Sequence, residues 1–218
     1  KDTGNGQVTE EKGALATSHD KIGSVYKLRG QSALALEEYK QALHLRREML
    51  DAEPQNATFE EKVLDVQDSL GALEIAIGDN DGALDTYRGA KPLTEELARR
   101  DPTNAEYQRW RARVAADLGY ALLLTGKFTE SLESLGQAIA LQKDLVARDP
   151  KSTRYKVDLS RSYTRAADAY LGLGNSAEAI GGYKLALDMR RELVDREATS
   201  VPFRRSYAWS YAKLADAY

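Results

Sequence analysis

Apolar residues recur at helical intervals along nearly the whole chain. One segment over 105–126 closes on a glycine, and the next, over 127–150, closes on a proline. Spacing of this kind predicts amphipathic helices. The closing residues mark helix ends, because glycine adopts the left-handed backbone of a helix terminus and proline cannot continue a helix. The pattern therefore predicts an all-α chain built from pairs of helices.

The helix pairs repeat at a fixed interval of 48 residues, the difference between 78 and 30. The positions that keep this interval are Gly30, Gly78, Gly126 and Gly174, together with Pro54, Pro102 and Pro150. A fixed period of this size is typical of stacked helical units. We expect a polar linker over 1–10 and a solenoid over 11–218, with repeats at about 11–56, 57–104, 105–152 and 153–200 and a partial repeat at 201–218. The expected fold class is an all-α superhelix of four helix pairs and a final single helix.

The joints that contain proline are interpreted as helix boundaries. In each joint an asparagine or serine stands two residues after the proline, at Asn56, Asn104 and Ser152. Such a side chain can accept hydrogen bonds from the first amides of the following helix. We therefore predict that these residues cap the first helix of each pair. For the second helices the predicted caps are Ser32, Asn80, Thr129 and Ser176.

Two repeats carry the residue spacing of a known repeat family. The tetratricopeptide pattern, W-x2-L-G-x2-Y followed by A-x3-F, appears as His19-x2-Ile22-Gly23-x2-Tyr26 with Ala35-x3-Tyr39, and as Tyr163-x2-Ala166-Ala167-x2-Tyr170 with Ala179-x3-Tyr183. The chain thus resembles the tetratricopeptide repeat from about residue 11 to 218. Its period exceeds the family's roughly 34 residues, and the surplus lengthens each helix by about two turns. This long-period form is similar to arrays found downstream of bacterial protein kinases of the eukaryotic serine/threonine type.

Composition narrows the function classes. The chain has 31 basic and 34 acidic residues, so it lacks the positive surplus that drives nucleic-acid binding. No apolar run approaches the roughly 20 residues that cross a bilayer, so we expect no membrane contact by this segment. The sequence does not determine the cellular compartment of the chain. A cytoplasmic location is favoured, but an extracytoplasmic one is expected if the array follows a kinase and its membrane span.

Candidate chemistry is sparse. His19 and His44 are not at metal-ligand spacing with carboxylates, and the stretch around Gly126 lacks the glycine frame of a phosphate loop. Acidic residues around 79–81 do not complete a calcium loop. We therefore expect no catalytic, metal-binding or cofactor-binding residues, no cofactor, and no enzymatic activity in this chain.

The resemblance implies a binding surface. In the tetratricopeptide family the first helix of each pair lines a concave groove that holds a protein or peptide partner. Carried over to this sequence, the groove residues are Arg109, Arg113, Tyr120, Leu123, Leu124, Arg161, Asp168 and Leu171. We expect the tyrosine and leucines to be apolar anchors and the arginines to hold acidic groups of the partner. The alternative for the arginines is that they pair along their own helices.

The function expected from these observations is a non-catalytic protein interaction scaffold within a larger bacterial signalling protein. The identity of its partner stays open. An alternative in a different class is a structural self-assembly module that stacks through its terminal helices.

Overall fold

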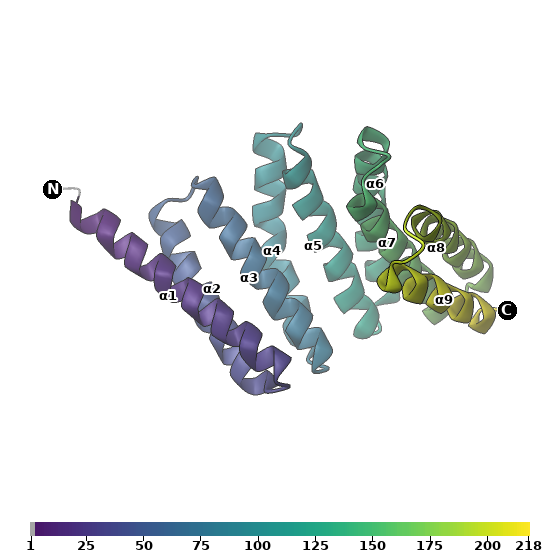
Figure 1. Cartoon of the computed structure of the whole chain (residues 1–218), viewed down its shortest axis with the longest axis horizontal. Coiled ribbons are helices and arrows are strands. Elements are labelled where there is room, and N and C mark those ends of the chain that lie inside the picture. The colour runs from purple at the N-terminus through teal and green to yellow at the C-terminus, as the bar shows by residue number, and fades with distance from the viewer. Residues whose placement is uncertain (1–2) are drawn as a thin grey trace. The chain divides into compact units, whose positions relative to one another are not determined.

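The computed structural model describes residues 3–218, with side chains from residue 9 onward. In that part of the chain all regular structure is helical, with nine helices and no strand (Figure 1). They are α1 (Thr3–Leu28), α2 (Ser32–Ala52), α3 (Ala57–Ala76), α4 (Asn80–Arg100), α5 (Ala105–Leu124), α6 (Phe128–Arg148), α7 (Thr153–Gly172), α8 (Ser176–Arg196) and α9 (Val201–Asp216). The expected fold class, an all-α helical repeat of four helix pairs and a final helix, is confirmed.

The predicted caps of the first helices are confirmed. Asn56 accepts hydrogen bonds from the amides of Thr58 and Phe59 at the start of α3. Asn104 caps α5 in the same way, and Ser152 caps α7. These side chains satisfy amides that have no partner within the helix. The helices they cap begin at residues 57, 105 and 153, which are separated by the same interval as the repeated glycines.

The predicted caps of the second helices are wrong by one or two positions. The N-cap residues of α2, α6 and α8 are Gln31, Lys127 and Asn175, and none of their side chains makes a capping bond. Helix α4 begins at Asn80 itself, and the preceding Asp79 accepts from the Gly82 amide at 3.0 Å. The glycines before these helices are left-handed, with φ of 72°, 82°, 75° and 78° at Gly30, Gly78, Gly126 and Gly174, and each second helix begins two residues after its glycine.

The N-terminal end also differs from the expected linker over 1–10. Residues 1 and 2 lie outside the described part, but α1 begins at Thr3 and includes the rest of this segment. Gly4 and Gly6 argue against a helix by propensity alone. Adding turns to an existing helix costs much less than starting one, so a segment of weak propensity can extend α1.

The chain comprises two compact units, residues 1–93 and 94–218. The boundary lies within α4, next to Pro92. In the first unit α1 packs against α2, and α2 against α3. Its core includes Ala35, Tyr39, Ala42, Val63 and Val66, all almost completely buried. None of the described helices is long and apolar enough to cross a bilayer.

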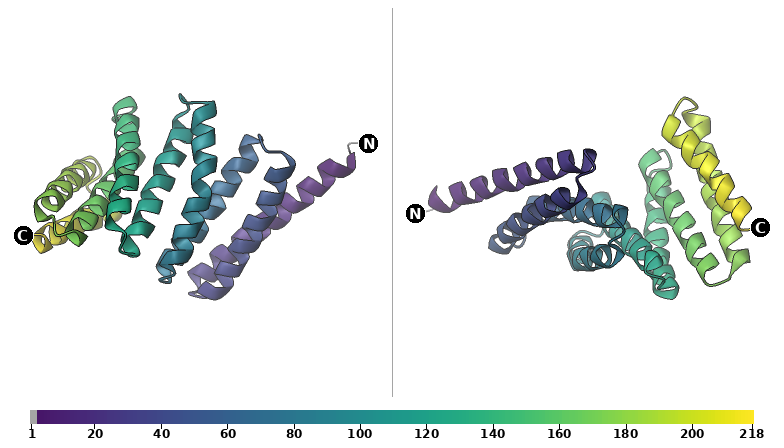
Figure 2. Two further views of the ribbon diagram at one scale, coloured as in Figure 1. Left: turned by 180° about the vertical axis from the view of Figure 1, so that it is seen from behind. Right: turned by 90° about the horizontal axis from the view of Figure 1, so that it is seen from below.

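The second unit continues the same pattern. Each helix from α5 to α9 packs against the next, and the two first helices α5 and α7 also contact each other. Figure 2 shows these pairs from two further sides. At the C-terminal end, α7, α8 and α9 with its C-cap residue share a core of Ala167, Ala179, Tyr183 and Ala217. This core fixes α9 against the preceding pair and so sets the position of its polar side chains.

Candidate binding site on the second unit

A cavity of about 270 Å³ opens among α5, α7, α8 and α9. Its walls combine four cationic side chains, two aromatic rings, one carboxylate and one hydroxyl. The lining residues are Tyr120 on α5, Arg161, Thr164, Arg165 and Asp168 on α7, Arg190 on α8, and Trp209 and Lys213 on α9. Arginine and aromatic side chains together are typical of surfaces that bind other proteins.

Three of the predicted groove residues meet in this cavity: Tyr120, Arg161 and Asp168. The side chain of Asp168 is held by two donors, the Tyr183 hydroxyl at 2.5 Å and the Lys213 ammonium at 2.8 Å. Burial, together with this carboxylate, raises the pKa of Tyr183 well above its ordinary value, so the phenol stays a donor. Asp168 is therefore fixed and its charge is balanced by Lys213.

Tyr120 is covered by a guanidinium. The centre of the Arg165 guanidinium lies 4.3 Å from the centroid of the Tyr120 ring. The same guanidinium donates to the Ala116 carbonyl at 3.0 Å and to Asp117 Oδ1 at 2.7 Å. Arg165 is thus ion-paired within the chain, and it holds the tyrosine ring against the wall of the cavity by a cation–π contact.

Arg190 reaches the cavity from a second helix and is only 6% exposed. It donates to the hydroxyls of Ser210 at 2.6 Å and Thr164 at 3.0 Å, and lies 5.4 Å from the ring of Trp209. Among the described residues, no carboxylate lies within ion-pair distance of its guanidinium. Burial and the nearby charge of Arg161 lower the pKa of Arg190 to about 10, so it remains a cation at neutral pH.

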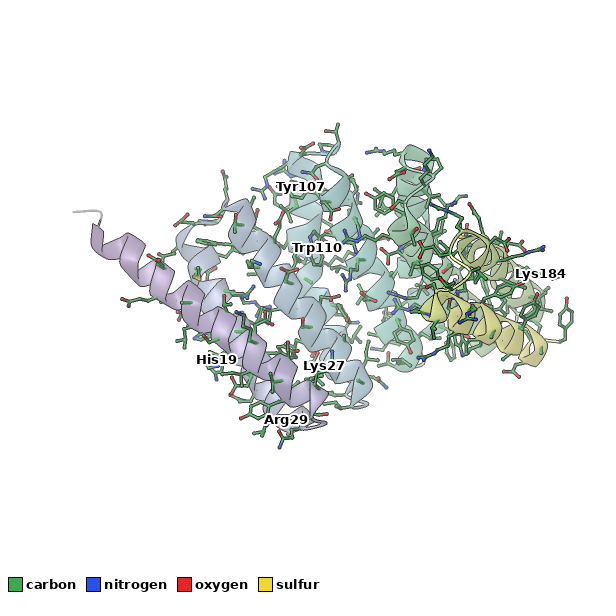
Figure 3. The ribbon with its side chains drawn as sticks, viewed as in Figure 1. His19, Lys27, Arg29, Tyr107, Trp110 and Lys184 are labelled. Carbon is green, nitrogen blue, oxygen red and sulfur yellow. The ribbon has the colours of Figure 1, made fainter. Side chains whose placement is uncertain are left out.

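The other two predicted arginines lie nearer the start of α5, outside the cavity lining. Arg109 is buried, with its Nε 3.5 Å from Asp158 Oδ2, and burial lowers the pKa of Arg109. Arg113 lies over the Trp110 ring at 5.6 Å, and its Nε is 3.9 Å from Asp117 Oδ2. Figure 3 labels Trp110 on α5. Both arginines already have acidic neighbours in the chain, so an acidic ligand would have to compete for them.

The three predicted leucine anchors lie at the C-terminal ends of α5 and α7. Leu124 is 38% exposed, whereas Leu123 is half-buried. Leu171 is also half-buried and packs against the core that α7, α8 and α9 share. None of the three lines the cavity. They can extend an apolar surface beside it, but Tyr120 and Trp209 supply the aromatic surface within it.

Sequence reasoning missed Arg165, Arg190, Trp209 and Lys213. Trp209 follows Arg161 at the repeat interval, since 209 minus 161 is 48. Extending the predicted groove positions of the first helices into the partial repeat would therefore have indicated Trp209. Lys213 follows Arg165 at the same interval. Arg190 gave no such signal, because it comes from a second helix while the expected wall consists of first helices.

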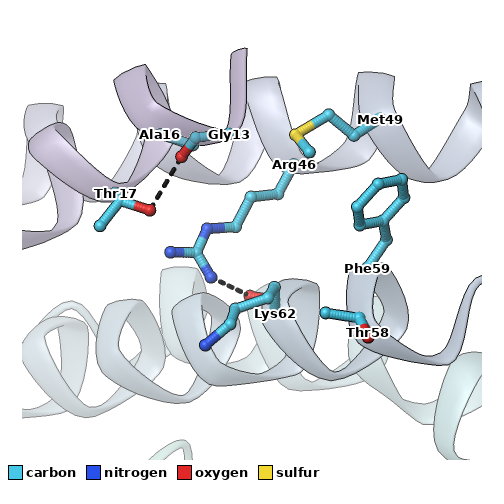
Figure 4. Close-up of a pocket in the computed structure, with 8 residues that line it drawn as sticks. All are labelled: Gly13, Ala16, Thr17, Arg46, Met49, Thr58, Phe59 and Lys62. Atoms are coloured by element: carbon cyan, nitrogen blue, oxygen red, sulfur yellow. Dashed lines mark hydrogen bonds between the residues drawn. The ribbon is translucent and has the colours of Figure 1, made fainter. Parts of the chain in front are cut away.

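The first unit holds a smaller cavity of about 160 Å³ beside a buried arginine, Arg46 (Figure 4). Arg46 donates to the Lys62 carbonyl at 2.9 Å, and its other terminal nitrogen lies 3.5 Å from Asp20 Oδ2. Met49 and Phe59 form the apolar part of the lining. The geometry therefore repeats one element, a buried arginine on a second helix, with a different partner in each unit.

The arrangement of helix pairs defines an all-α helical-repeat protein with a tetratricopeptide-like fold. Residues 160–193 match the family model of the tetratricopeptide repeat. The resemblance to the tetratricopeptide repeat is thereby confirmed over residues 160–193, and the likeness of the long-period form to arrays downstream of protein kinases stays a prediction. Proteins with this repeat generally mediate protein–protein interaction, and such scaffolds are typically non-enzymatic. No curated protein matches the chain in sequence.

Solved structures share the fold at low sequence identity. A kinesin light chain-like protein of Podosopora anserina with nearly identical TPR-like repeats matches with a TM-score of 0.65 and 20% identity, over 95% of this chain and 86% of that one. BtubC (BKLC) from P. vanneervenii matches with a TM-score of 0.61 and 14% identity, over 96% and 81%. MamA protein matches with a TM-score of 0.53 and 20% identity, over 94% and 87%.

Proposed function

We propose that the chain is a non-catalytic scaffold that binds a protein or peptide segment on the face formed by α5, α7 and α9. The observation that carries this proposal is the cavity itself. Successive first helices bring Tyr120, Arg161 and Trp209 to one place, although these residues are far apart in the sequence. Tyrosine, tryptophan and arginine are the residues that contribute most to binding at protein interfaces.

The two rings and the charges have different tasks in this proposal. Trp209 is 46% exposed, which leaves apolar surface for a side chain of the partner. Tyr120 is held in place by Arg165, so binding costs little ordering of that ring. Arg161 is exposed and Asp168 is fixed, and charges placed in this way select the orientation of a bound segment.

The predicted groove residues outside the cavity extend the same surface. Leu123, Leu124 and Leu171 would contact apolar side chains of the segment. Arg109 and Arg113 would contact acidic groups only by exchanging their present neighbours, Asp158 and Asp117. The setting within a bacterial signalling protein downstream of a kinase rests on the resemblance of the long-period repeats alone.

The test is a selection of peptides from a random display library on the purified chain, followed by calorimetry with the selected peptides. Replacing Tyr120 and Arg161 together by alanine is expected to weaken binding by more than about 2 kcal/mol, or roughly thirtyfold. Arg204→Ala, at an exposed position of α9 outside the cavity, is the matched control. Unchanged affinity in the double variant, with its thermal unfolding intact, would contradict the proposal.

Exposed apolar residues favour a second candidate function, self-assembly through the terminal helices. Helix α1 exposes Leu15, Ile22 and Val25, and α9 exposes Val201 and Tyr211. A second copy could cover these residues in a head-to-tail contact. Light scattering over a concentration series separates the two functions. A monomer throughout supports the scaffold, and growth that Val201→Asp abolishes supports assembly.

A further inference from the structure

Two of the buried arginines in the described part of the chain, Arg46 and Arg190, stand at equivalent repeat positions but have different neighbours. Arg46 and Arg190 are both 6% exposed and both lie on second helices. The neighbour of Arg46 is the carboxylate of Asp20 at 3.5 Å. At the position equivalent to Asp20 the second unit has Thr164, whose hydroxyl accepts from Arg190 at 3.0 Å. The threonine accepts a hydrogen bond but carries no charge. The carboxylate that acts on Arg190 is Asp168, which lies beyond ion-pair distance and is already paired with Lys213.

The cavity beside Arg190 has more cations than it has acids to pair with them. Lys213 is paired with Asp168, and Arg165 with Asp117. Arg161 and Arg190 have no carboxylate within ion-pair distance in the described part of the chain. Removing the acidic partner from a buried cation is costly unless another anion takes its place. Two guanidiniums without an ion-paired carboxylate in one cavity therefore favour a ligand with about two negative charges.

We propose that this cavity binds a phosphoryl group, carried on a phosphorylated side chain of the bound segment. The inference rests on the proposed function, because it names the ligand chemistry of that same site. A phosphorylated side chain carries about −1.5 to −2 charges at neutral pH and has three strong acceptor oxygens. A single carboxylate would balance only one of the two arginines. Guanidinium groups match phosphoryl oxygens with paired donors.

The geometry of the cavity suits such a group. Arg161 is exposed and Arg190 is buried, so one guanidinium can meet the anion at the entrance and the other within the site. The hydrogen bonds to Ser210 and Thr164 orient the Arg190 guanidinium before any ligand arrives. The ring of Trp209, 5.4 Å from Arg190 and 46% exposed, can contact the carbon atoms that carry the phosphoryl group.

The test is an NMR titration of the whole chain with O-phospho-L-serine and O-phospho-L-tyrosine, followed at the indole N–H of Trp209. L-serine, L-tyrosine and L-glutamate are the comparison compounds. The chain has two tryptophans, so the Trp110 signal, assigned with Trp110→Phe, provides a second reporter. We expect saturable shifts of Trp209 with the phosphorylated compounds and binding of glutamate at least tenfold weaker.

Two variants test the charge argument. Thr164→Asp recreates the pairing of Asp20 with Arg46 and should weaken binding of the phosphorylated compounds by about tenfold or more. Arg161→Ala, at an exposed position, should do the same, and it decides the matter if Thr164→Asp does not fold. Arg204→Ala is the control that should bind unchanged.

Failure of this inference is distinguishable from failure of the proposed function. No saturable shift of Trp209 with either phosphorylated compound, or unchanged binding in both cavity variants, overturns the phosphoryl site. The scaffold function stands in that case if unphosphorylated peptides selected on the chain lose affinity when Tyr120 and Arg161 are replaced. Saturable phosphoryl binding that both cavity variants weaken supports the inference.

Discussion

Asp117 and Arg165 occupy equivalent positions in consecutive repeats, 165 minus 117 being the repeat interval of 48, and their side chains form an ion pair at 2.7 Å. The side chains are only 12% and 13% exposed. This repeat position is acidic on α5 and basic on α7, and the resulting ion pair connects the two helices. The same arginine also covers Tyr120, so the pair links the packing of the repeats to the wall of the cavity.

The first prediction concerns this pair. Asp117→Ala should lower the free energy of unfolding by about 2 kcal/mol, because it leaves Arg165 with little solvent and no acidic partner. Urea unfolding followed by circular dichroism measures the change.

The matched control for Asp117→Ala is Asp195→Ala. Asp195 pairs with Arg191 at 4.0 Å, but these side chains are 70% and 69% exposed. Exposed pairs contribute little, so the loss there should stay below about 0.5 kcal/mol. Equal losses in the two variants would show that the pair between α5 and α7 is as weak as a surface contact.

The second prediction concerns the glycine that ends α5. Gly126 has φ of 75°, with no atom within 4 Å of the place where a Cβ would stand. Gly126→Ala should therefore cost about 1 kcal/mol or more of unfolding free energy through backbone strain alone. Gly136→Ala is the counterpart, because Gly136 lies inside α6 with the same open space. That change should stabilise by about 0.5 to 1 kcal/mol. If the unfolding temperatures of Gly126→Ala and Gly136→Ala shift in the same direction, the left-handed backbone at Gly126 is not the cause of the strain.

The third prediction concerns Glu74, which stands where the tetratricopeptide pattern has tyrosine. The residue is 4% exposed, and its carboxyl accepts from the Thr86 hydroxyl at 2.7 Å. Burial raises the pKa of Glu74, so the folded chain favours the protonated form. The contribution of this group to stability is full below the unfolded pKa and is lost as pH rises through the higher folded pKa.

Glu74→Gln removes that loss and keeps an acceptor for Thr86. The unfolding free energy of Glu74→Gln minus that of the wild type should therefore grow as pH rises from about 4 toward neutrality. Urea unfolding at a series of pH values measures the difference. Glu61→Gln, at an exposed position of α3, should give a difference that is flat across the series. A flat difference for Glu74→Gln as well would contradict the effect of burial.

Much of the fold follows from local patterns in the sequence. The caps Asn56, Asn104 and Ser152 and the left-handed Gly30 could be predicted, because each acts through backbone that is adjacent in the chain. The caps of the second helices could not, since the N-cap residues of α2, α6 and α8 make no side-chain capping bond and so carry no residue-type signal.

The candidate site was only partly predictable. Tyr120, Arg161 and Asp168 follow from the family pattern, and the cavity includes all three. Whether an arginine is available depends on its neighbours in space. Arg109 lies beside Asp158, which comes from another helix, and no spacing within α5 indicates that contact. Arg190 comes from a second helix, so the pattern of first-helix positions did not indicate it either.

The most direct measurement of the central claim is the NMR footprint of a selected peptide on the isotope-labelled chain. The account predicts that saturating peptide shifts the indole N–H of Trp209 and the backbone amides around Tyr120 and Arg161. Saturable binding that leaves all of these signals in place, and shifts only residues of the first unit or of α6, would contradict it.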